Sequence, residues 1–260
     1  MRLLWPVLLL LSCSISAAPC TIRASVSGAL SPYYFYDEAQ QVSGFSVDML
    51  NMLFEPTGCK LTFIELPWGR SLELLLDGDI DIMTNLTATQ DREPYLYFIG
   101  PHNEERMVVI VDTQKVSDVH DFVQLTQSGV FVAALANGYY GPEFEQAKNN
   151  DADFNQNLVL LRTSETQRKM LSSGRVSAVI EDEQVYRHWV DEYQLDADRF
   201  VIAFTLYSSP VYLGLSRESL SPRQIDILRA QWQRMLENGA LKALAERYQV
   251  SLPLPAIAID

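Results

Sequence analysis

The sequence predicts an α/β fold of two lobes, in which each lobe is a mostly parallel sheet flanked by helices. Two observations support this prediction. Short β-rich runs alternate with amphipathic helical runs, and the alternation occurs in two successive series along the 260 residues. A strand–helix–strand succession favours parallel strands joined by right-handed crossovers, and a chain of this length can build two hydrophobic cores.

The first series begins at Thr21 and contains three strands and two helices. Apolar residues recur at helical spacing in the first helix, and Pro56 and Gly58 follow it as stop signals. Gly78 ends the second helix. In chain order we expect strand Thr21–Val26, helix Phe45–Phe54, strand Leu61–Leu66, helix Ser71–Leu76 and strand Ile80–Met83.

The second series repeats this alternation. Ser164 and Gln167 fit a capping box at the start of a helix that ends at Gly174. In chain order we expect strands Met107–Val111 and Val130–Leu135, the helix from Ser164, strand Val176–Ile180, helix Glu183–Tyr193, and strands Phe200–Thr205 and Val211–Leu215.

Two further helices are expected near the C-terminus. Ser221 can cap the first of them, Pro222 suits its first position, and Gln224 completes a capping box. Gly239 ends this helix, and the second covers Leu241–Tyr248. Because these helices need a sheet to cover, we expect them to return to the first lobe.

This return implies that the chain crosses between the lobes twice, near Arg106–Val111 and near Phe204–Pro210. We therefore expect one lobe to consist of residues 19–106 and 208–260, and the other of residues 107–207. Two crossings make a hinge, and the cleft between the lobes becomes the natural ligand site.

Residues 1–18 have the features of a signal peptide. Arg2 precedes an apolar run that is too short to span a bilayer, and Ser16-Ala17-Ala18 fits a small-x-small cleavage site. The alternative is a lipoprotein in which Cys13 is lipidated. Cleavage after Ala18 predicts an exported mature protein.

Cleavage leaves two cysteines, Cys20 and Cys59, and each directly precedes an expected strand. If those strands are parallel neighbours, both cysteines lie at the same sheet edge, within bridging distance. Export permits a disulfide, so we predict a Cys20–Cys59 bridge; the alternative is two unpaired thiols. With no third or fourth ligand nearby in the sequence, metal binding is not expected.

The composition argues against several functions. A formal net charge of -13 disfavours a nucleic-acid partner. The three histidines, His102, His120 and His188, share no motif with a nucleophile or with metal ligands, and no Gly-rich phosphate loop appears. These absences favour a binding protein, without cofactor, over an enzyme.

The stretch GDIDIMTNLTATQDR changes from an apolar strand to a polar loop. Asn85 and Thr87 follow the expected strand, and Arg92 comes a few residues later. In an open α/β sheet, ligands meet the chain beyond the carboxyl ends of strands, and arginine offers a planar fork for a carboxylate. The alternative is an ordinary polar loop in which Arg92 pairs with a surface acid such as Asp91 or Glu93.

The same region resembles the signature of family 3 extracellular solute-binding proteins, the periplasmic receptors of amino-acid ABC transporters. Its pattern has Gly78 and Asp81 around the strand, Thr89 and Arg92 after the polar turn, and an aromatic strand that ends at Pro101. Three further stretches match the family in order: PYYF followed by GFSVD, GRVSAV followed by ED, and NGAL through the last helix. The resemblance extends over the whole mature chain.

The resemblance implies a type II periplasmic-binding-protein fold whose lobes close on a small ligand, an amino acid or a related small acid. A membrane ABC permease would recognise the closed form, and a periplasmic monomer is expected. The resemblance also implies that Arg92 grips the ligand carboxylate, helped by Thr87 and Asn85, while Asp182 takes the α-ammonium from the opposite lobe. Asp182 can also cap the helix that follows it, and the two roles can coexist.

Aromatic residues complete the expected site. Tyr33 and Tyr34 lie near a strand end, where they can screen the ligand from water. Trp68 and Arg70 form a Trp-x-Arg element, which supplies either an aromatic wall and a second cation or a core residue and a surface charge.

One position departs from the family pattern. Receptors of this family usually have Ser or Thr after the glycine that corresponds to Gly138, whereas this chain has Tyr139 and Tyr140. These tyrosines either fill part of the cleft or leave the ligand to backbone N–H groups.

Two other functions stay open. Periplasmic cyclohexadienyl dehydratases resemble this family and act on amino-acid-like substrates such as arogenate. They need a general acid in the cleft, and Glu181 and Glu65 are candidates by position. The third possibility is a sensor that presents its closed form to a signalling receptor.

Overall fold

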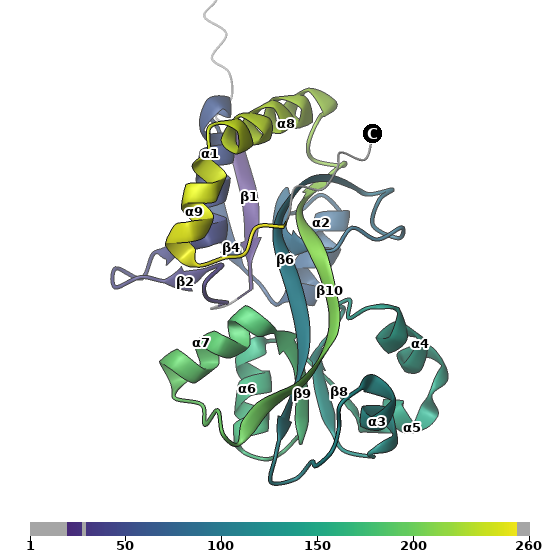
Figure 1. Cartoon of the computed structure of the whole chain (residues 1–260). Coiled ribbons are helices and arrows are strands. Elements are labelled where there is room, and N and C mark those ends of the chain that lie inside the picture. The colour runs from purple at the N-terminus through teal and green to yellow at the C-terminus, as the bar shows by residue number, and fades with distance from the viewer. Residues whose placement is uncertain (1–19, 28–29, 254–260) are drawn as a thin grey trace, which may run out of the picture.

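Figure 1 shows the computed structural model, which describes residues 20–27 and 30–253. The chain forms two lobes, and the long strands β6 (Leu96–Asp112) and β10 (Phe200–Ser216) run from one lobe into the other. Helices flank the sheet in each lobe, so the predicted two-lobe α/β fold is confirmed. The predicted signal peptide, and with it Cys13, lies outside the described residues.

Within the described residues, one eight-stranded sheet passes through both lobes in the order β4–β1–β5–β10–β6–β9–β7–β8. In the first lobe, parallel pairing joins β1 to its two neighbours, and in the second lobe it joins β7 to its two neighbours. β6 and β10 run antiparallel to the strands beside them and join the two parallel halves. The bounds are β1 Thr21–Val26, β4 Lys60–Glu65, β5 Ile82–Leu86, β7 Val132–Leu135, β8 Leu158–Leu161 and β9 Ala178–Asp182.

The two crossings are longer strands than the sequence indicates. We expected short strands at Met107–Val111, Phe200–Thr205 and Val211–Leu215, but each crossing is one strand of 17 residues. The two strands pair along almost their whole length, with register shifts. Polar side chains do not end a strand whose backbone N–H and C=O groups find partners in an antiparallel neighbour, which explains the difference.

The C-terminal helices return to the first lobe, as expected. α1 (Phe45–Phe54), α8 (Pro222–Glu237) and α9 (Ala240–Tyr248) pack against one another, and α2 (Trp68–Leu76) lies against β5. The capping box that begins at Ser221 is present. The lobe bounds, residues 19–106 with 208–260 and residues 107–207, stay a prediction.

The second lobe contains elements that the sequence did not indicate. α6 (Ser164–Ser172) and α7 (Glu183–Tyr193) were expected, whereas three other helices and β8 were not. Short helices with few apolar residues show little periodicity, which explains the omission. The unexpected helices are α3 Phe122–Gln127, α4 Pro142–Asn150 and α5 Ala152–Asn157. The remaining short elements, all in the first lobe, are β2 Phe35–Tyr36, β3 Val42–Ser43 and the 3-10 turn Glu55–Thr57.

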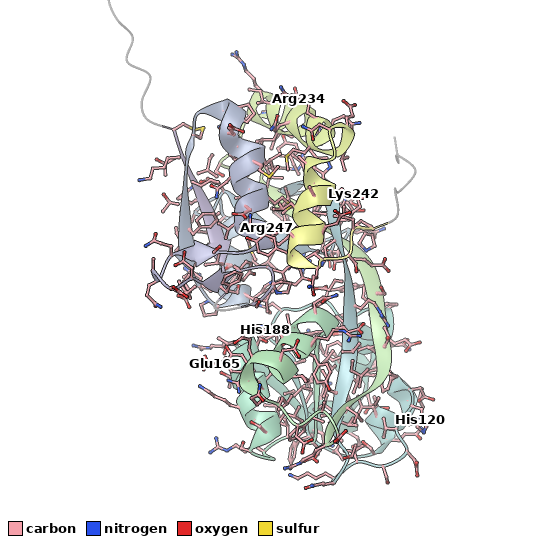
Figure 2. All side chains as sticks on the ribbon, turned by 60° about the vertical axis from the view of Figure 1, so that its left-hand side comes forward. His120, Glu165, His188, Arg234, Lys242 and Arg247 are labelled. Atoms are coloured by element: carbon pink, nitrogen blue, oxygen red, sulfur yellow. A yellow bond between two sulfur atoms is a disulfide. The ribbon has the colours of Figure 1, made fainter. Side chains whose placement is uncertain are left out.

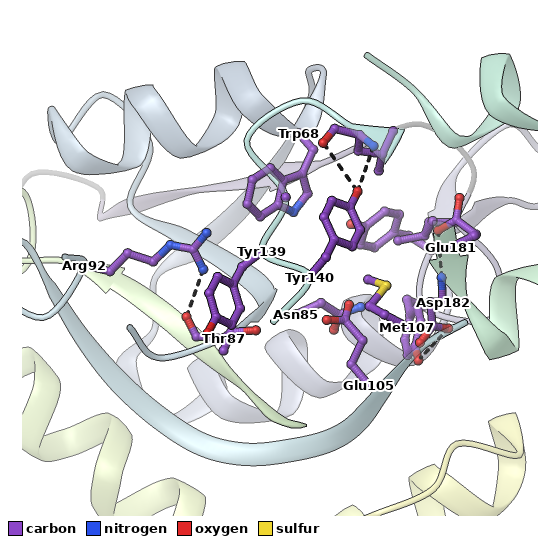
Figure 3. A pocket seen from close by; sticks show the side chains of 15 residues that line it. Trp68, Asn85, Thr87, Arg92, Glu105, Met107, Tyr139, Tyr140, Glu181 and Asp182 are labelled. Atoms are coloured by element: carbon purple, nitrogen blue, oxygen red, sulfur yellow. Dashed lines mark hydrogen bonds between the residues drawn. The ribbon is translucent and has the colours of Figure 1, made fainter. Parts of the chain in front are cut away.

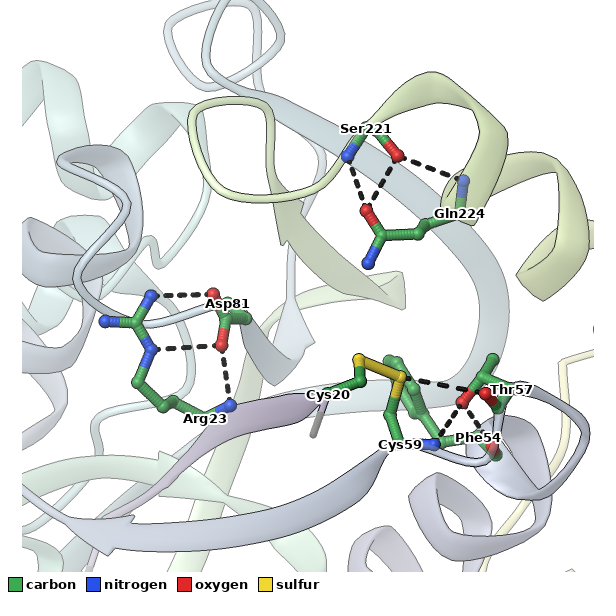
Figure 4. Close-up of a disulfide and its surroundings, with 8 residues drawn as sticks. All are labelled: Cys20, Arg23, Phe54, Thr57, Cys59, Asp81, Ser221 and Gln224. Atoms are coloured by element: carbon green, nitrogen blue, oxygen red, sulfur yellow. Dashed lines mark hydrogen bonds and ion pairs between the residues drawn. A yellow bond between two sulfur atoms is a disulfide. The ribbon is translucent and has the colours of Figure 1, made fainter. Parts of the chain in front are cut away.

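The predicted disulfide is present at the edge of the first lobe (Figure 4). Cys20 immediately precedes β1 and Cys59 immediately precedes β4, and Thr21 lies opposite Lys60 in the parallel pair. The Cα atoms of the two cysteines are therefore only 4.6 Å apart, and their sulfur atoms are bonded. The bridge joins residues that are 39 positions apart in the sequence.

The C-terminal helices are amphipathic surface helices. Arg234, Lys242 and Arg247 are exposed on α8 and α9 (Figure 2), while Trp232 and Leu241 are buried against the lobe. Within residues 20–27 and 30–253, no helix combines the length and the apolar content that crossing a bilayer requires.

Candidate ligand site between the lobes

A cavity of about 60 Å³ lies where the two lobes meet (Figure 3). It contains all of the residues that we predicted for the ligand site except Arg70. The lining residues are Leu30, Tyr33, Tyr34, Trp68, Asn85, Thr87, Arg92, Glu105, Met107, Leu135, Gly138, Tyr139, Tyr140, Glu181 and Asp182. Ligand sites typically measure roughly 300 Å³ or more, so a ligand larger than a few atoms enters only when the lobes part.

β5 carries its polar residues farther into the sheet than expected. We predicted that this strand ends at Met83, but it continues to Leu86, which lies opposite Tyr212 of β10. Backbone pairing with β10 extends β5 through these polar positions. Asn85 therefore belongs to the strand, beside a register shift, with a positive φ of 57° that asparagine tolerates better than most residues.

A buried histidine holds Asn85 in place. The Asn85 N–H donates to Nε2 of His102 over 3.3 Å. Burial lowers the pKa of His102 to about 3, so the imidazole is neutral and can accept this hydrogen bond. The side-chain Oδ1 of Asn85 is buried and accepts no hydrogen bond from the described residues, so a ligand donor can use it.

Arg92 is a buried cation whose positive charge few neighbouring groups compensate. Only 8% of its surface is exposed, and burial lowers the pKa of its guanidinium. Its Nη1 donates to the backbone oxygen of Thr87 over 2.9 Å, and the guanidinium lies 5.5 Å from the ring centroid of Trp68. It forms no ion pair with any described residue, and the alternative pairing with Asp91 or Glu93 is not seen. The remaining donors of the fork can take a ligand anion.

Asp182 faces the cavity from the second lobe. It ends β9 and caps α7, because its Oδ1 accepts the N–H groups of Gln184 and Val185 over 2.9 and 3.2 Å. Burial raises the pKa of Asp182 to about 6, although these N–H groups oppose the rise. Tyr33 of the first lobe places its hydroxyl 3.5 Å from the same Oδ1. The capping role therefore exists, and the carboxylate still faces the cavity.

Glu181 is the neighbouring acid, and it is held rigidly. Its Oε2 accepts hydrogen bonds from Ser164 over 2.6 Å and from Gln167 over 3.0 Å. We expected Ser164 to cap α6, but Thr163 does so, one residue earlier, which leaves Ser164 free for this contact. Burial raises the pKa of Glu181 to about 7 despite these bonds.

Tyrosines narrow the cavity from both lobes. Tyr33 is 1% exposed, and its hydroxyl accepts a hydrogen bond from Asn103 over 2.6 Å. Tyr139 packs edge-on against Tyr207 of β10, with ring centroids 5.4 Å apart. The hydroxyl of Tyr140 turns back to the N–H of Leu135 over 2.7 Å. The side chains that replace the usual Ser or Thr therefore occupy space at the cavity.

Comparison of the sequence with models of protein families assigns the chain to a family. A model of the bacterial extracellular solute-binding proteins, family 3, matches residues 22–251. The chain belongs to this family.

Two relatives match the chain in sequence, and a solved structure matches it in fold. A probable histidine-binding protein of Neisseria gonorrhoeae is 28% identical over 228 residues, which cover 87% of this chain and 82% of the relative. The cyclohexadienyl dehydratase of Pseudomonas aeruginosa is 26% identical over 110 residues, which cover 42% of this chain and 41% of the enzyme. The structure of an ancestral arginine-binding protein bound to glutamine superposes with a TM-score of 0.75 at 19% identity, covering 89% of this chain and 99% of that one.

Two residues considered from the sequence lie outside the cavity of this family 3 protein. Arg70 is exposed and pairs with Glu73 over 3.0 Å, which is the surface charge of the alternative interpretation. Glu65, one of the two acids considered for catalysis, is exposed and accepts a hydrogen bond from the hydroxyl of Tyr36. Glu181, the other, is in the cavity.

The structure also adds a charged residue that the sequence did not point to. Glu105 lines the cavity from β6, between the two lobes, and is half-buried. Its stretch, HNEER, has the composition of a surface turn. Only the knowledge that β6 continues through this stretch and crosses between the lobes could have placed Glu105 in the site of a solute-binding protein.

Proposed function

We propose that this family 3 protein captures an amino acid as a zwitterion in the cavity between its lobes. The observation that carries this proposal is Arg92, a buried cation without a counter-ion among the described residues, across the cavity from Asp182. A ligand taken out of water needs both of its charges matched, or the desolvation cost dominates. Arg92 would bind the α-carboxylate, and Asp182 the α-ammonium.

The setting of this binding is part of the proposal. The mature protein would act in the periplasm after removal of residues 1–18, as a monomer, and an ABC permease in the inner membrane would recognise its closed form. The family to which the chain belongs supports this setting, as does the relative described as a probable histidine-binding protein. Thr87 would help to orient Arg92 through its backbone oxygen, while Trp68, Tyr33, Tyr34 and Tyr139 would exclude water.

A thermal-shift screen of the mature protein against the standard amino acids tests the proposal. A ligand at about 100 times its Kd stabilises the folded state by roughly 2.7 kcal/mol. The hit is then titrated by calorimetry against wild type, Arg92→Met and the matched surface control Arg70→Met. We expect only Arg92→Met to lose binding. If no amino acid raises the Tm, or if Arg92→Met binds the hit within about threefold of wild type, the proposal is wrong.

A second candidate function rests on Glu181. This buried acid, with a pKa of about 7, could act as a general acid on a cyclohexadienyl substrate such as arogenate or prephenate. The relative that is a cyclohexadienyl dehydratase points the same way, although the match covers less than half of each chain. Incubation with arogenate and with prephenate decides between the functions. We expect the wild-type protein to form no phenylalanine or phenylpyruvate. If wild type forms either product and Glu181→Gln does not, the protein is the enzyme instead.

A further inference from the structure

The charges around the cavity do not balance. Among the described residues that line it, Arg92 is the only cation, and it faces three carboxylates, those of Glu105, Glu181 and Asp182. In Figure 3, Arg92 lies at one end of the cavity, Glu181 and Asp182 lie at the other, and Glu105 lies between them. A simple zwitterion would pair its carboxylate with Arg92 and its ammonium with one of the three acids, which leaves two acidic side chains without a cation.

The three carboxylates differ in what compensates them. Asp182 accepts the N–H groups at the start of α7, and Glu181 accepts hydrogen bonds from Ser164 and Gln167. Glu105 makes no side-chain hydrogen bond or ion pair with any residue of 20–27 and 30–253. Burial raises the pKa of Glu105 well above its usual range, and the nearby Asp182 and Glu181 add to the rise, while the charge of Arg92, which is not in contact with Glu105, opposes it. The fold therefore leaves the Glu105 carboxylate without a partner.

A second unpartnered acceptor lies in the same cavity. Oδ1 of Asn85, in a residue that is only 9% exposed, accepts no hydrogen bond from the described residues. An ammonium or guanidinium group carries several N–H donors and no acceptor. Such a group can satisfy a carboxylate and an amide oxygen together, whereas an apolar side chain can satisfy neither.

We propose that Glu105 selects a ligand with a second positive charge, an amino acid with a cationic side chain such as arginine, lysine or ornithine. This inference rests on the proposed function, because it takes the α-carboxylate to be on Arg92 and the α-ammonium to be on Asp182. The side-chain cation then lies at Glu105, on the crossing strand, where both lobes can enclose it. Truncating one member of a buried charge pair weakens binding by roughly 30-fold to several-thousand-fold, so Glu105 should dominate selectivity.

Matched ligand pairs test the inference with the charge as the only large variable. Arginine and citrulline have nearly the same shape, norleucine is lysine without its terminal ammonium, and only the first of each pair has a cationic side chain. Calorimetric titration of the mature protein at pH 7.5 should show arginine or lysine binding at least about 30-fold more tightly than its partner, or about 2 kcal/mol. Glu105→Gln should reduce this preference to less than about threefold and change the affinity for the neutral member little.

Glu104→Gln is the matched control. Glu104 precedes Glu105 on β6 and therefore points to the other face of the strand, where it is exposed and accepts a hydrogen bond from Ser208 over 2.9 Å. This variant removes the same charge one residue away and should keep the wild-type preference. Thermal unfolding of each variant without ligand verifies that it is folded.

The outcomes separate this inference from the proposed function. If wild type binds citrulline or norleucine as tightly as the cationic partner, or if folded Glu105→Gln keeps the preference, Glu105 does not select charge and the inference is wrong. In that case binding that still depends on Arg92 leaves the proposed function intact. If neither member of either pair binds, and no other amino acid does, both fail together.

Discussion

Two arginines of the first lobe are held in opposite ways. Arg23, on β1, forms a two-point pair with Asp81 (Figure 4), with distances of 3.0 Å from Nε and 2.7 Å from Nη2. It donates again to the backbone oxygen of Gly78. The guanidinium of Arg92, in the cavity, donates to the backbone oxygen of Thr87 alone among the described residues (Figure 3). Yet Arg92 is 8% exposed, whereas the side chain of Arg23 is 37% exposed.

This difference distinguishes framework residues, which stabilise a lobe, from site residues, which would bind the ligand. A charge that completes its hydrogen bonds inside a lobe contributes to that lobe whether or not a ligand is present. A buried charge without a partner destabilises the unliganded protein, and it is tolerated when a ligand later supplies the partner. The same rule applies to the acids: the pKa of Asp81 is lowered by its hydrogen bonds to Arg23, although burial opposes this, whereas burial raises the pKa of Glu105.

The largest expected effects come from replacing each arginine with methionine. Arg92→Met should weaken ligand binding by about 2–5 kcal/mol, while the free energy of unfolding without ligand stays the same or rises. Arg23→Met should do the reverse. It strands Asp81, whose side chain is 6% exposed, and lowers the free energy of unfolding by about 1–3 kcal/mol, with affinity unchanged.

Calorimetry gives the affinities, and urea unfolding gives the stabilities. The comparison fails if both variants lose the same property. A loss of stability in Arg92→Met equal to that in Arg23→Met would make Arg92 another framework residue.

The sequence could predict the elements whose pattern is local. Strand β1, helix α1 and the capping box at Ser221 depend on neighbouring residues, and all three are present as predicted. The disulfide was predictable because Cys20 and Cys59 precede two strands whose parallel pairing follows from their order. The gathering of Arg92 and Asp182 at one cavity required the family resemblance, since spacing alone allowed a surface ion pair.

What the sequence could not predict depends on long-range pairing. β6 and β10 stay strands through polar stretches because each satisfies the other's backbone, and the two stretches are about a hundred positions apart. Glu105 was missed for this reason, since its surroundings in the sequence are those of an exposed turn. The end of β5 was misplaced for the same reason, because the ladder to Tyr212 carries it past Asn85.

Loss of the disulfide, another framework feature, should lower the stability of the protein without changing its affinity for the ligand. The Cys20→Ser, Cys59→Ser double variant loses a bridge across 39 positions, which should lower the free energy of unfolding by about 2–4 kcal/mol. The bridge lies at a sheet edge of the first lobe, away from the cavity lining, so the affinity should stay within about threefold of wild type. Urea unfolding and calorimetry measure the two quantities. A tenfold loss of affinity in the folded variant would contradict the separation.

The pH dependence of stability should distinguish the two kinds of acid. The pKa values of Glu181 and Asp182 are raised to about 7 and about 6, so between roughly pH 4 and 7 the native state holds protons that the unfolded chain releases. Their contribution to the free energy of unfolding therefore falls as the pH rises, on the order of 1–3 kcal/mol. Asp81, with its lowered pKa, acts oppositely: its contribution is present above its unfolded pKa and is lost as the pH falls through its folded pKa.

Urea unfolding of the unliganded protein at pH 5, 6, 7 and 8 measures this slope. Glu181→Gln, which cannot titrate, should flatten the decline between pH 5 and 7. An identical pH profile in wild type and Glu181→Gln would show that this carboxyl is not the source.

The smallest expected effect is at a contact that exists only when the lobes are together. Gly69 lies near the start of α2 in the first lobe, and a Cβ added there would be 2.8 Å from Nδ2 of Asn137 in the second lobe. Alanine suits a helix better than glycine, so Gly69→Ala should not lower the stability of the unliganded protein. It should hinder closure, but only modestly, because the Asn137 side chain can turn aside. We expect the affinity to fall by about 3- to 10-fold.

The rescue variant makes this effect specific. Asn137→Gly removes the obstructing side chain and keeps a residue that accepts the positive φ of 63° at this position. Calorimetry on Gly69→Ala with Asn137→Gly should therefore recover an affinity within about twofold of Asn137→Gly alone. If the double variant stays as weak as Gly69→Ala, the loss arises within the first lobe. Gly69 would then belong with Arg23 to the framework, and the contact between the lobes would not limit closure.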